Sequence, residues 1–123
     1  MVYLNSVLKV IDNSGARTVK CIKIYNKSPK SCAVVGDLLL VVVKTYTPNK
    51  KVKKGELYKA VVVRSAKQAS RYGGVYIRCG ESAVVLLNQR MMPLGSRVLS
   101  AVCIELCKIP MFFRIVSMAP TII

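Results

Sequence analysis

The chain has 123 residues, with 20 Lys or Arg against 5 Asp or Glu and no His, which gives a formal net charge of +15. Its longest aliphatic run, residues 38–43, is six residues long, whereas a membrane-spanning helix needs about 20, so such a helix is excluded. Without His there is no Ser-His or Cys-His arrangement, and the five acids show no paired spacing. We therefore expect no enzyme, no metal site and no cofactor.

The positive charge extends from Lys9 to Arg114, so the body of the fold itself must be basic. A domain of this kind binds phosphate backbones, and its affinity falls steeply with salt. The alternative is a small basic protein that is simply well solvated. The length fits one domain, 1–123, with one core.

The first half of the chain is typical of β-strands. Residues 7–11 form a short apolar run that ends at Asp12-Asn13-Ser14-Gly15, a strong turn sequence. A second strand is predicted over 17–25. Because its apolar side chains change from one face to the other, we expect a bulge in it.

A long hairpin with a cationic tip is predicted next. Residues 38–46 and 56–64 are its strands, and we expect burial on both faces over 38–43, where apolar residues do not alternate with polar ones. Between the strands lie Lys50, Lys51, Lys53 and Lys54, which repel one another and gain most from a neighbouring polyanion.

The elements predicted in the second half of the chain are shorter. Residues 65–74 are polar and carry Lys67 and Arg71, and a strand pair is expected from 75–79 and 83–88. Ser100 is a predicted N-cap for a helix over 101–108, and 112–119 predicts another helix before Pro120.

The expected fold is mostly β, a compact barrel over about 1–98 with a short helical C-terminal patch over about 99–123. Val102 and Leu106 should pack inward. The surplus of apolar residues in this patch predicts a surface covered by another protein, with Cys103 and Cys107 as cross-linking positions.

The five cysteines are odd in number and form no CxxC pair, which favours reduced thiols in an intracellular compartment. The chain also begins without a signal or transit pattern, so import is not expected.

Tyr46, Tyr58, Tyr72 and Tyr76 stand among the basic residues and suggest either base stacking or ordinary packing. A free-standing barrel that binds single-stranded nucleic acid is therefore an alternative function.

Specific motifs follow one another along the whole chain: LKVIDNSGAR at 8–17, VKKG at 52–55, KAVVVR at 59–64, GVYIR at 74–78, GSRV at 95–98, EL at 105–106 and IVSMAP at 115–120. In order and spacing they resemble the universal large-subunit ribosomal protein L-fourteen family, of the bacterial or organellar type.

This resemblance implies a five-stranded β-barrel with a projecting β-hairpin and short C-terminal helices. It also implies a structural protein that binds large-subunit rRNA at the subunit interface and reaches small-subunit rRNA in bridges. The implied neighbours are ribosomal proteins L-three and L-nineteen, and a ribosome silencing factor is a further candidate partner. No membrane is implied.

Charge pattern and resemblance together predict the rRNA-binding residues Asn13, Arg17, Lys44, Lys50, Lys51, Lys53, Lys54, Arg64, Lys67, Arg71, Arg78, Arg90 and Arg97. The resemblance assigns Ser96, Arg97 and Arg114 to the bridge or silencing-factor face.

Composition also bears on the compartment. The chain has 5 Cys, 6 Tyr and 13 Lys against 7 Arg, and it departs from the family pattern at Cys79-Gly80 and in the Cys103–Cys107 segment, which is normally more charged. These features resemble drift in a small organellar genome. We expect an organelle-encoded protein of a ribosome in the mitochondrial matrix, with the bacterial cytoplasm or a plastid as alternatives.

Overall fold

The computed structural model describes residues 2–25, 28, 30–66, 69–71 and 73–123. The strands are β1 (Val7–Val10), β2 (Ala16–Ile24), β3 (Leu38–Tyr46), β4 (Leu57–Arg64), β5 (Ala69–Arg71), β6 (Val75–Ile77) and β7 (Ala83–Leu87). Two 3-10 turns, η1 (Ile104–Lys108) and η2 (Pro110–Phe112), precede the helix α1 (Phe113–Met118). No helix in the described ranges is both long and apolar enough to cross a membrane.

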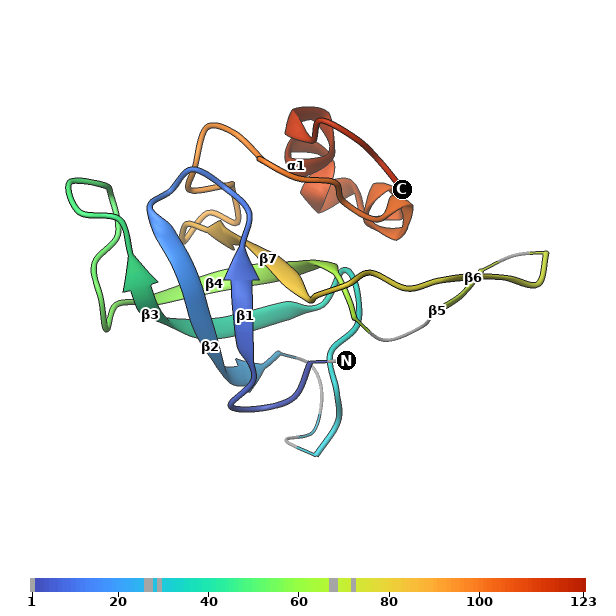
Figure 1. Cartoon of the computed structure of the whole chain (residues 1–123), viewed down its shortest axis with the longest axis horizontal. Coiled ribbons are helices and arrows are strands. Elements are labelled where there is room, and N and C mark those ends of the chain that lie inside the picture. The colour runs from blue at the N-terminus through green and yellow to red at the C-terminus, as the bar shows by residue number, and fades with distance from the viewer. Residues whose placement is uncertain (1, 26–27, 29, 67–68, 72) are drawn as a thin grey trace.

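Five strands close a barrel in the order β1-β2-β3-β4-β7, as Figure 1 shows. Neighbours pair antiparallel except for β1 and β7, which close the barrel in parallel. The predicted irregularity in β2 is confirmed by shifts of its register with β3, one of them between Cys21 and Lys23. The predicted five-stranded barrel is therefore confirmed.

The projecting hairpin is β5–β6, and it extends away from the barrel at the right of Figure 1. The predicted pairing of 75–79 with 83–88 is wrong. β6 pairs with β5, whereas β7 pairs with β4 and β1 inside the barrel. Sequence neighbourhood suggested a local hairpin, but the apolar β7 gains more burial as a barrel strand, where every one of its residues is buried.

The core has two parts, one on each side of the barrel wall. Leu39, Val41, Ala60, Val62 and other inward side chains fill the barrel. The opposite faces of β4 and β7 pack against the C-terminal segment, whose buried side chains include Val102 and Leu106 as predicted. Burial on both faces, expected for 38–43, is found instead in β4 and β7, which lie under that segment. In β3 buried and half-buried residues alternate.

The C-terminal segment is less helical than expected. The predicted helix over 101–108 is only the 3-10 turn η1, and its N-cap residue is Cys103. Ser100 is not the cap, because its hydroxyl accepts a hydrogen bond from Arg64 Nη1 at 2.9 Å. The second predicted helix is confirmed as α1, which ends before Pro120.

Candidate nucleic-acid interface

Three segments meet at one end of the barrel: the turn after β1, the lysine loop (residues 47–56) between β3 and β4, and the segment 93–97 after β7. Gly15 accepts a hydrogen bond from the Thr47 backbone N–H at 2.7 Å, and Leu94 N–H donates to Leu86 O at 3.0 Å. Lys51 Nζ donates to Leu94 O at 3.3 Å. The lysine loop is the tip of the predicted hairpin, whose strands β3 and β4 pair antiparallel, and it lies against the barrel end.

Asp12 fixes the turn from inside. Its buried carboxylate accepts hydrogen bonds from the N–H and hydroxyl of Ser14 through Oδ1 and from the N–H of Leu86 through Oδ2. Buried amide groups left without a partner cost about 1–3 kcal/mol, so these bonds tie the turn to β7. Asp12 thus serves the structure of the site.

The pH dependence of stability should show this burial. Burial raises the pKa of the Asp12 carboxyl above its ordinary value of 3.8, and the hydrogen bonds from Ser14 and Leu86 offset this only in part. The unfolded chain loses this proton first, so the contribution of Asp12 to the free energy of unfolding is largest below pH 3.8 and falls as pH rises through the higher folded pKa.

Asp12→Asn removes this titration and adds a constant cost of about 1–2 kcal/mol, since its amide N–H₂ faces the N–H of Leu86. In urea unfolding across this pH range, we expect the stability advantage of the unchanged chain over Asp12→Asn to shrink as pH rises. An advantage that grows with pH would contradict the assignment.

Asn13 joins the turn to the segment 93–97. Its Oδ1 accepts hydrogen bonds from the backbone N–H groups of Ser96 at 2.8 Å and Arg97 at 2.9 Å, and its Nδ2 donates to Ser96 Oγ at 2.9 Å. Gly95 permits the approach, since a Cβ there would lie 2.6 Å from Asn13 Oδ1. Asn13 thus holds its neighbours in place with most of its hydrogen-bonding capacity.

Val52 anchors the lysine loop from the other side. It is buried among the barrel side chains, while all four lysines around it are exposed. The loop also packs on Gly15, whose φ is +113° and where a Cβ would overlap the Cβ of Lys50. The repulsion among four ammonium groups is therefore opposed by packing that keeps them together.

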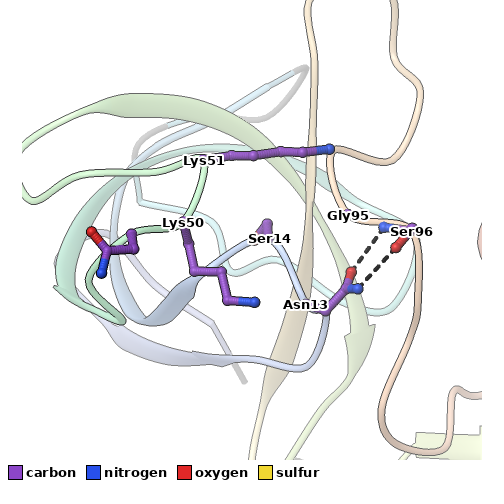
Figure 2. A pocket seen from close by; sticks show the side chains of 7 residues that line it. Asn13, Ser14, Lys50, Lys51, Gly95 and Ser96 are labelled. Atoms are coloured by element: carbon purple, nitrogen blue, oxygen red, sulfur yellow. Dashed lines mark hydrogen bonds between the residues drawn. The ribbon is translucent and has the colours of Figure 1, made fainter.

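A polar pocket of about 420 Å³ lies between these segments, lined by Asn13, Ser14, Asn49, Lys50, Lys51, Gly95 and Ser96. In Figure 2 Lys50 and Lys51 extend from one wall toward Asn13, Gly95 and Ser96 on the other. A second hollow, of about 440 Å³, shares Asn13 and Lys50 with the first and continues to Arg17 and Thr47. Arg17 Nε donates to Thr47 Oγ1 at 3.2 Å, which orients the guanidinium.

The cations outnumber the acids at this end of the barrel, where the acids include the buried Asp12 and Glu56 of the lysine loop, which accepts a hydrogen bond from the Tyr58 hydroxyl. Asp12 is buried, Asp37 accepts from Val34 N–H, and Glu81 pairs with Lys9 at 3.1 Å and lies 3.8 Å from Arg64. Within the described part of the chain, the lysines of the loop make no ion pair. The field here is that of a binding surface for anions.

The structure thus brings together Asn13, Arg17, Lys50, Lys51, Ser96 and Arg97, with Lys53 and Lys54 on the same loop. Arg64 lies elsewhere, with its guanidinium between Ser100 and Glu81 and only 15% of its side chain exposed. Its buried Nε has no hydrogen-bond partner among the described residues. Arg64 joins β4 to the C-terminal segment.

The other predicted residues that the structure describes lie outside this group. Lys44 is exposed at the end of β3, Arg78 follows the projecting hairpin, Arg90 lies in the turn after β7, and Arg114 is exposed on α1. Arg71 lies in β5, and Lys67 lies outside the described residues. Ser96 and Arg114, predicted for one face, thus belong to different parts of the fold.

Among the described residues that line the two hollows, none is a tyrosine. Tyr58 packs on the barrel core, and its hydroxyl donates to Glu56 Oε2 at 2.6 Å. Burial, with a smaller effect of Glu56, raises the pKa of Tyr58 to about 12. Tyr46 and Tyr76 are exposed on different strands, and Tyr72 lies outside the described residues.

Sequence reasoning missed three residues that line the pocket, Ser14, Asn49 and Gly95. The turn sequence at 12–15 and the irregular stretch around Gly95 predicted loops but not that these loops meet. The meeting depends on the parallel closure of β1 on β7, which local sequence does not reveal.

Comparison with known protein families agrees with this architecture. The family described as ribosomal protein L14p/L23e matches residues 1–123, which is the whole chain. This is the family that the motifs at 8–17, 52–55 and 95–98 resemble, and these motifs supply the segments that meet at the barrel end. The chain therefore belongs to the ribosomal protein L14p/L23e family, whose members are structural proteins of the large ribosomal subunit.

Proposed function

We propose that this protein binds large-subunit rRNA through the end of its barrel and contributes there to bridges between the subunits. The observation that carries the proposal is the meeting of Lys50 and Lys51 with the Asn13 turn and Ser96 around a polar pocket. Packing holds these groups in place before any RNA arrives. Preorganised charge of this kind costs little ordering entropy on binding.

The role is proposed to be structural and not catalytic. Lysines supply charge and reach for phosphates, and Arg17 and Arg97 add planar groups that bond phosphates with two N–H groups at once. Family membership supports rRNA and ribosomal proteins as partners. Among these we propose small-subunit rRNA across the bridges, proteins L-three and L-nineteen as neighbours, and a silencing factor near Ser96, Arg97 and Arg114.

The alternative, a free-standing barrel for single-stranded nucleic acid, requires aromatic side chains beside the cations. Among the described residues that line the pocket, none is aromatic. Sedimentation in a high-salt sucrose gradient separates the two functions. We expect the protein to travel with the large subunit, and its release to the top of the gradient would favour the alternative.

Part of the C-terminal surface supports the proposed protein neighbour. Ile104 is 49%, Met111 58% and Phe113 73% exposed, whereas Val102, Leu106 and Phe112 are buried. Of the six apolar residues behind the predicted surplus, Ile104 and Phe113 are exposed, Ile109 is half-buried, and Val102, Leu106 and Phe112 are buried. Cys103 is buried and unsuited to cross-linking, but Cys107 is exposed.

A cross-linker attached at Cys107 in intact large subunits is expected to capture a ribosomal protein, because Ile104 beside it needs an apolar partner. Cys107→Ser, which keeps the other four cysteines, serves as the control. Recovery of rRNA alone would contradict the prediction.

For the compartment we propose a mitochondrial ribosome and an organelle-encoded chain, on the basis of the Cys, Tyr and Lys usage. Pulse labelling with cytosolic translation blocked should still label this protein, and it should purify with mitochondria. Labelling that stops under the block, or recovery with plastid or cytosolic ribosomes, would contradict this while leaving the ribosomal role intact.

A further inference from the structure

The pocket at the barrel end has a more specific chemistry than a basic surface. Its volume of about 420 Å³ falls in the range of roughly 300–1,000 Å³ that small-molecule sites occupy. It is therefore large enough to receive one group of a polymer. Its walls come from three segments that hydrogen bonds and packing hold together.

The lining groups select for phosphate and sugar. Among its described residues are two ammonium groups, two side-chain amides and two hydroxyls, with neither a carboxylate nor an aromatic ring. The nearby carboxylate of Asp12 is buried and bonded to Ser14 and Leu86. The pocket thus attracts an anion and accepts polar hydroxyls, but it has no surface on which a base could stack.

The hydroxyl of Ser96 is directed by Asn13. Ser96 Oγ accepts a hydrogen bond from Asn13 Nδ2 at 2.9 Å, which leaves its own hydrogen for another acceptor. Ser96 is exposed on the pocket wall, and Figure 2 shows Lys50 and Lys51 facing it. An acceptor with several oxygens that enters between them would be bonded from both walls.

We propose that this pocket binds one phosphodiester group of RNA together with its ribose, while the base points outward. Lys50 and Lys51 supply the charge and Ser96 donates a hydrogen bond to a phosphate oxygen. Asn13 is a positioning residue that acts through Ser96. This inference rests on the proposed rRNA binding. The second hollow, which shares Asn13 and Lys50 and reaches Arg17, continues the path of the same strand.

Phosphate ethylation interference tests the proposal. A large-subunit rRNA fragment is ethylated on average once per molecule, and the RNA that the protein binds is separated from the RNA that it rejects. We expect one phosphate at which ethylation abolishes binding of the unchanged chain. With Lys50→Ser and Lys51→Ser together, ethylation of that phosphate should no longer matter, and with Ser96→Ala it should matter less, whereas Lys53→Ser with Lys54→Ser should leave the interference in place.

Affinity gives a second readout. Ser96→Ala should weaken binding about three- to tenfold, the effect of one hydrogen bond. Asn13→Asp keeps an oxygen that accepts hydrogen bonds from the N–H groups of Ser96 and Arg97. It replaces the Nδ2 donor by a carboxylate oxygen, so the Ser96 hydroxyl donates to that carboxylate and not to the phosphate, and it adds a negative charge. It should keep its melting temperature near that of the unchanged chain and lose the interference.

The outcomes separate the proposed function from the pocket proposal. If the unchanged chain does not bind the rRNA fragment or enter large subunits, the proposed function fails. If it binds, but no single phosphate interferes or the pattern is the same with Ser96→Ala and with the Lys50 and Lys51 replacements, the pocket proposal is overturned and rRNA binding stands.

Discussion

Replacing Lys50, Lys51, Lys53 and Lys54 together by Ser is expected to lower the affinity for large-subunit rRNA and to flatten its salt dependence. For each phosphate that is no longer neutralised by a lysine, the slope of log K against log salt should decrease by about 0.7 to 0.9, so four phosphates decrease it by about 2.8 to 3.6. At low salt, the affinity should fall by several orders of magnitude, because all four side chains are exposed on one anchored loop.

A matched variant controls for net charge. Lys20, Lys23, Lys30 and Lys108 lie away from the barrel-end pocket, and their replacement by Ser removes the same total charge. We expect filter binding at several salt concentrations to show a much smaller change in slope for this variant. Equal slopes for both variants would mean that the long-range field, and not the loop, binds the RNA.

The second large effect concerns Gly15. Its φ of +113° disfavours any residue with a side chain, and a Cβ there would overlap Lys50. Gly15→Ala should therefore destabilise the fold by about 2 kcal/mol or more, which for a domain of this size corresponds to roughly 5–10 °C in Tm. It should also weaken rRNA binding, since the lysine loop must shift.

Two other glycines separate the cost of the positive φ from the cost of the overlap with Lys50. Gly73 has a φ of +84° but open space around its Cβ position, and Gly80 has open space without a positive φ. Gly73→Ala should cost about 1 kcal/mol, and Gly80→Ala should cost little. Thermal melts and rRNA binding compare the three, and a Gly15→Ala chain that melts and binds like Gly73→Ala would show that the loop does not depend on this contact.

The sequence predicts the parts of this site better than their arrangement. The turn at Asp12–Gly15 follows from local chemistry, because these residues bond their own backbone or tolerate left-handed conformations. The exposure of the four lysines follows from their charge. Both predictions depend only on neighbouring residues, and the structure agrees with both.

Non-local pairing accounts for the main failures. The position of β7 between β1 and β4 joins segments more than 70 residues apart in sequence at Lys9 and Ala83, and no local pattern signals it. The same pairing allows Asn13 to meet Ser96. Arg64 shows the reverse case. As a basic residue in a family motif it is predicted to contact RNA, but its guanidinium donates a hydrogen bond to Ser100 within the chain.

The central claim is that the barrel end, with Lys50, Lys51 and Ser96 around its pocket, lies on large-subunit rRNA. A density map of the intact large subunit that contains this protein tests it most directly. We predict rRNA backbone within hydrogen-bond distance of these side chains, with one phosphate inside the pocket. A map in which this end of the barrel faces solvent or another protein, while rRNA contacts a different surface, would contradict the account.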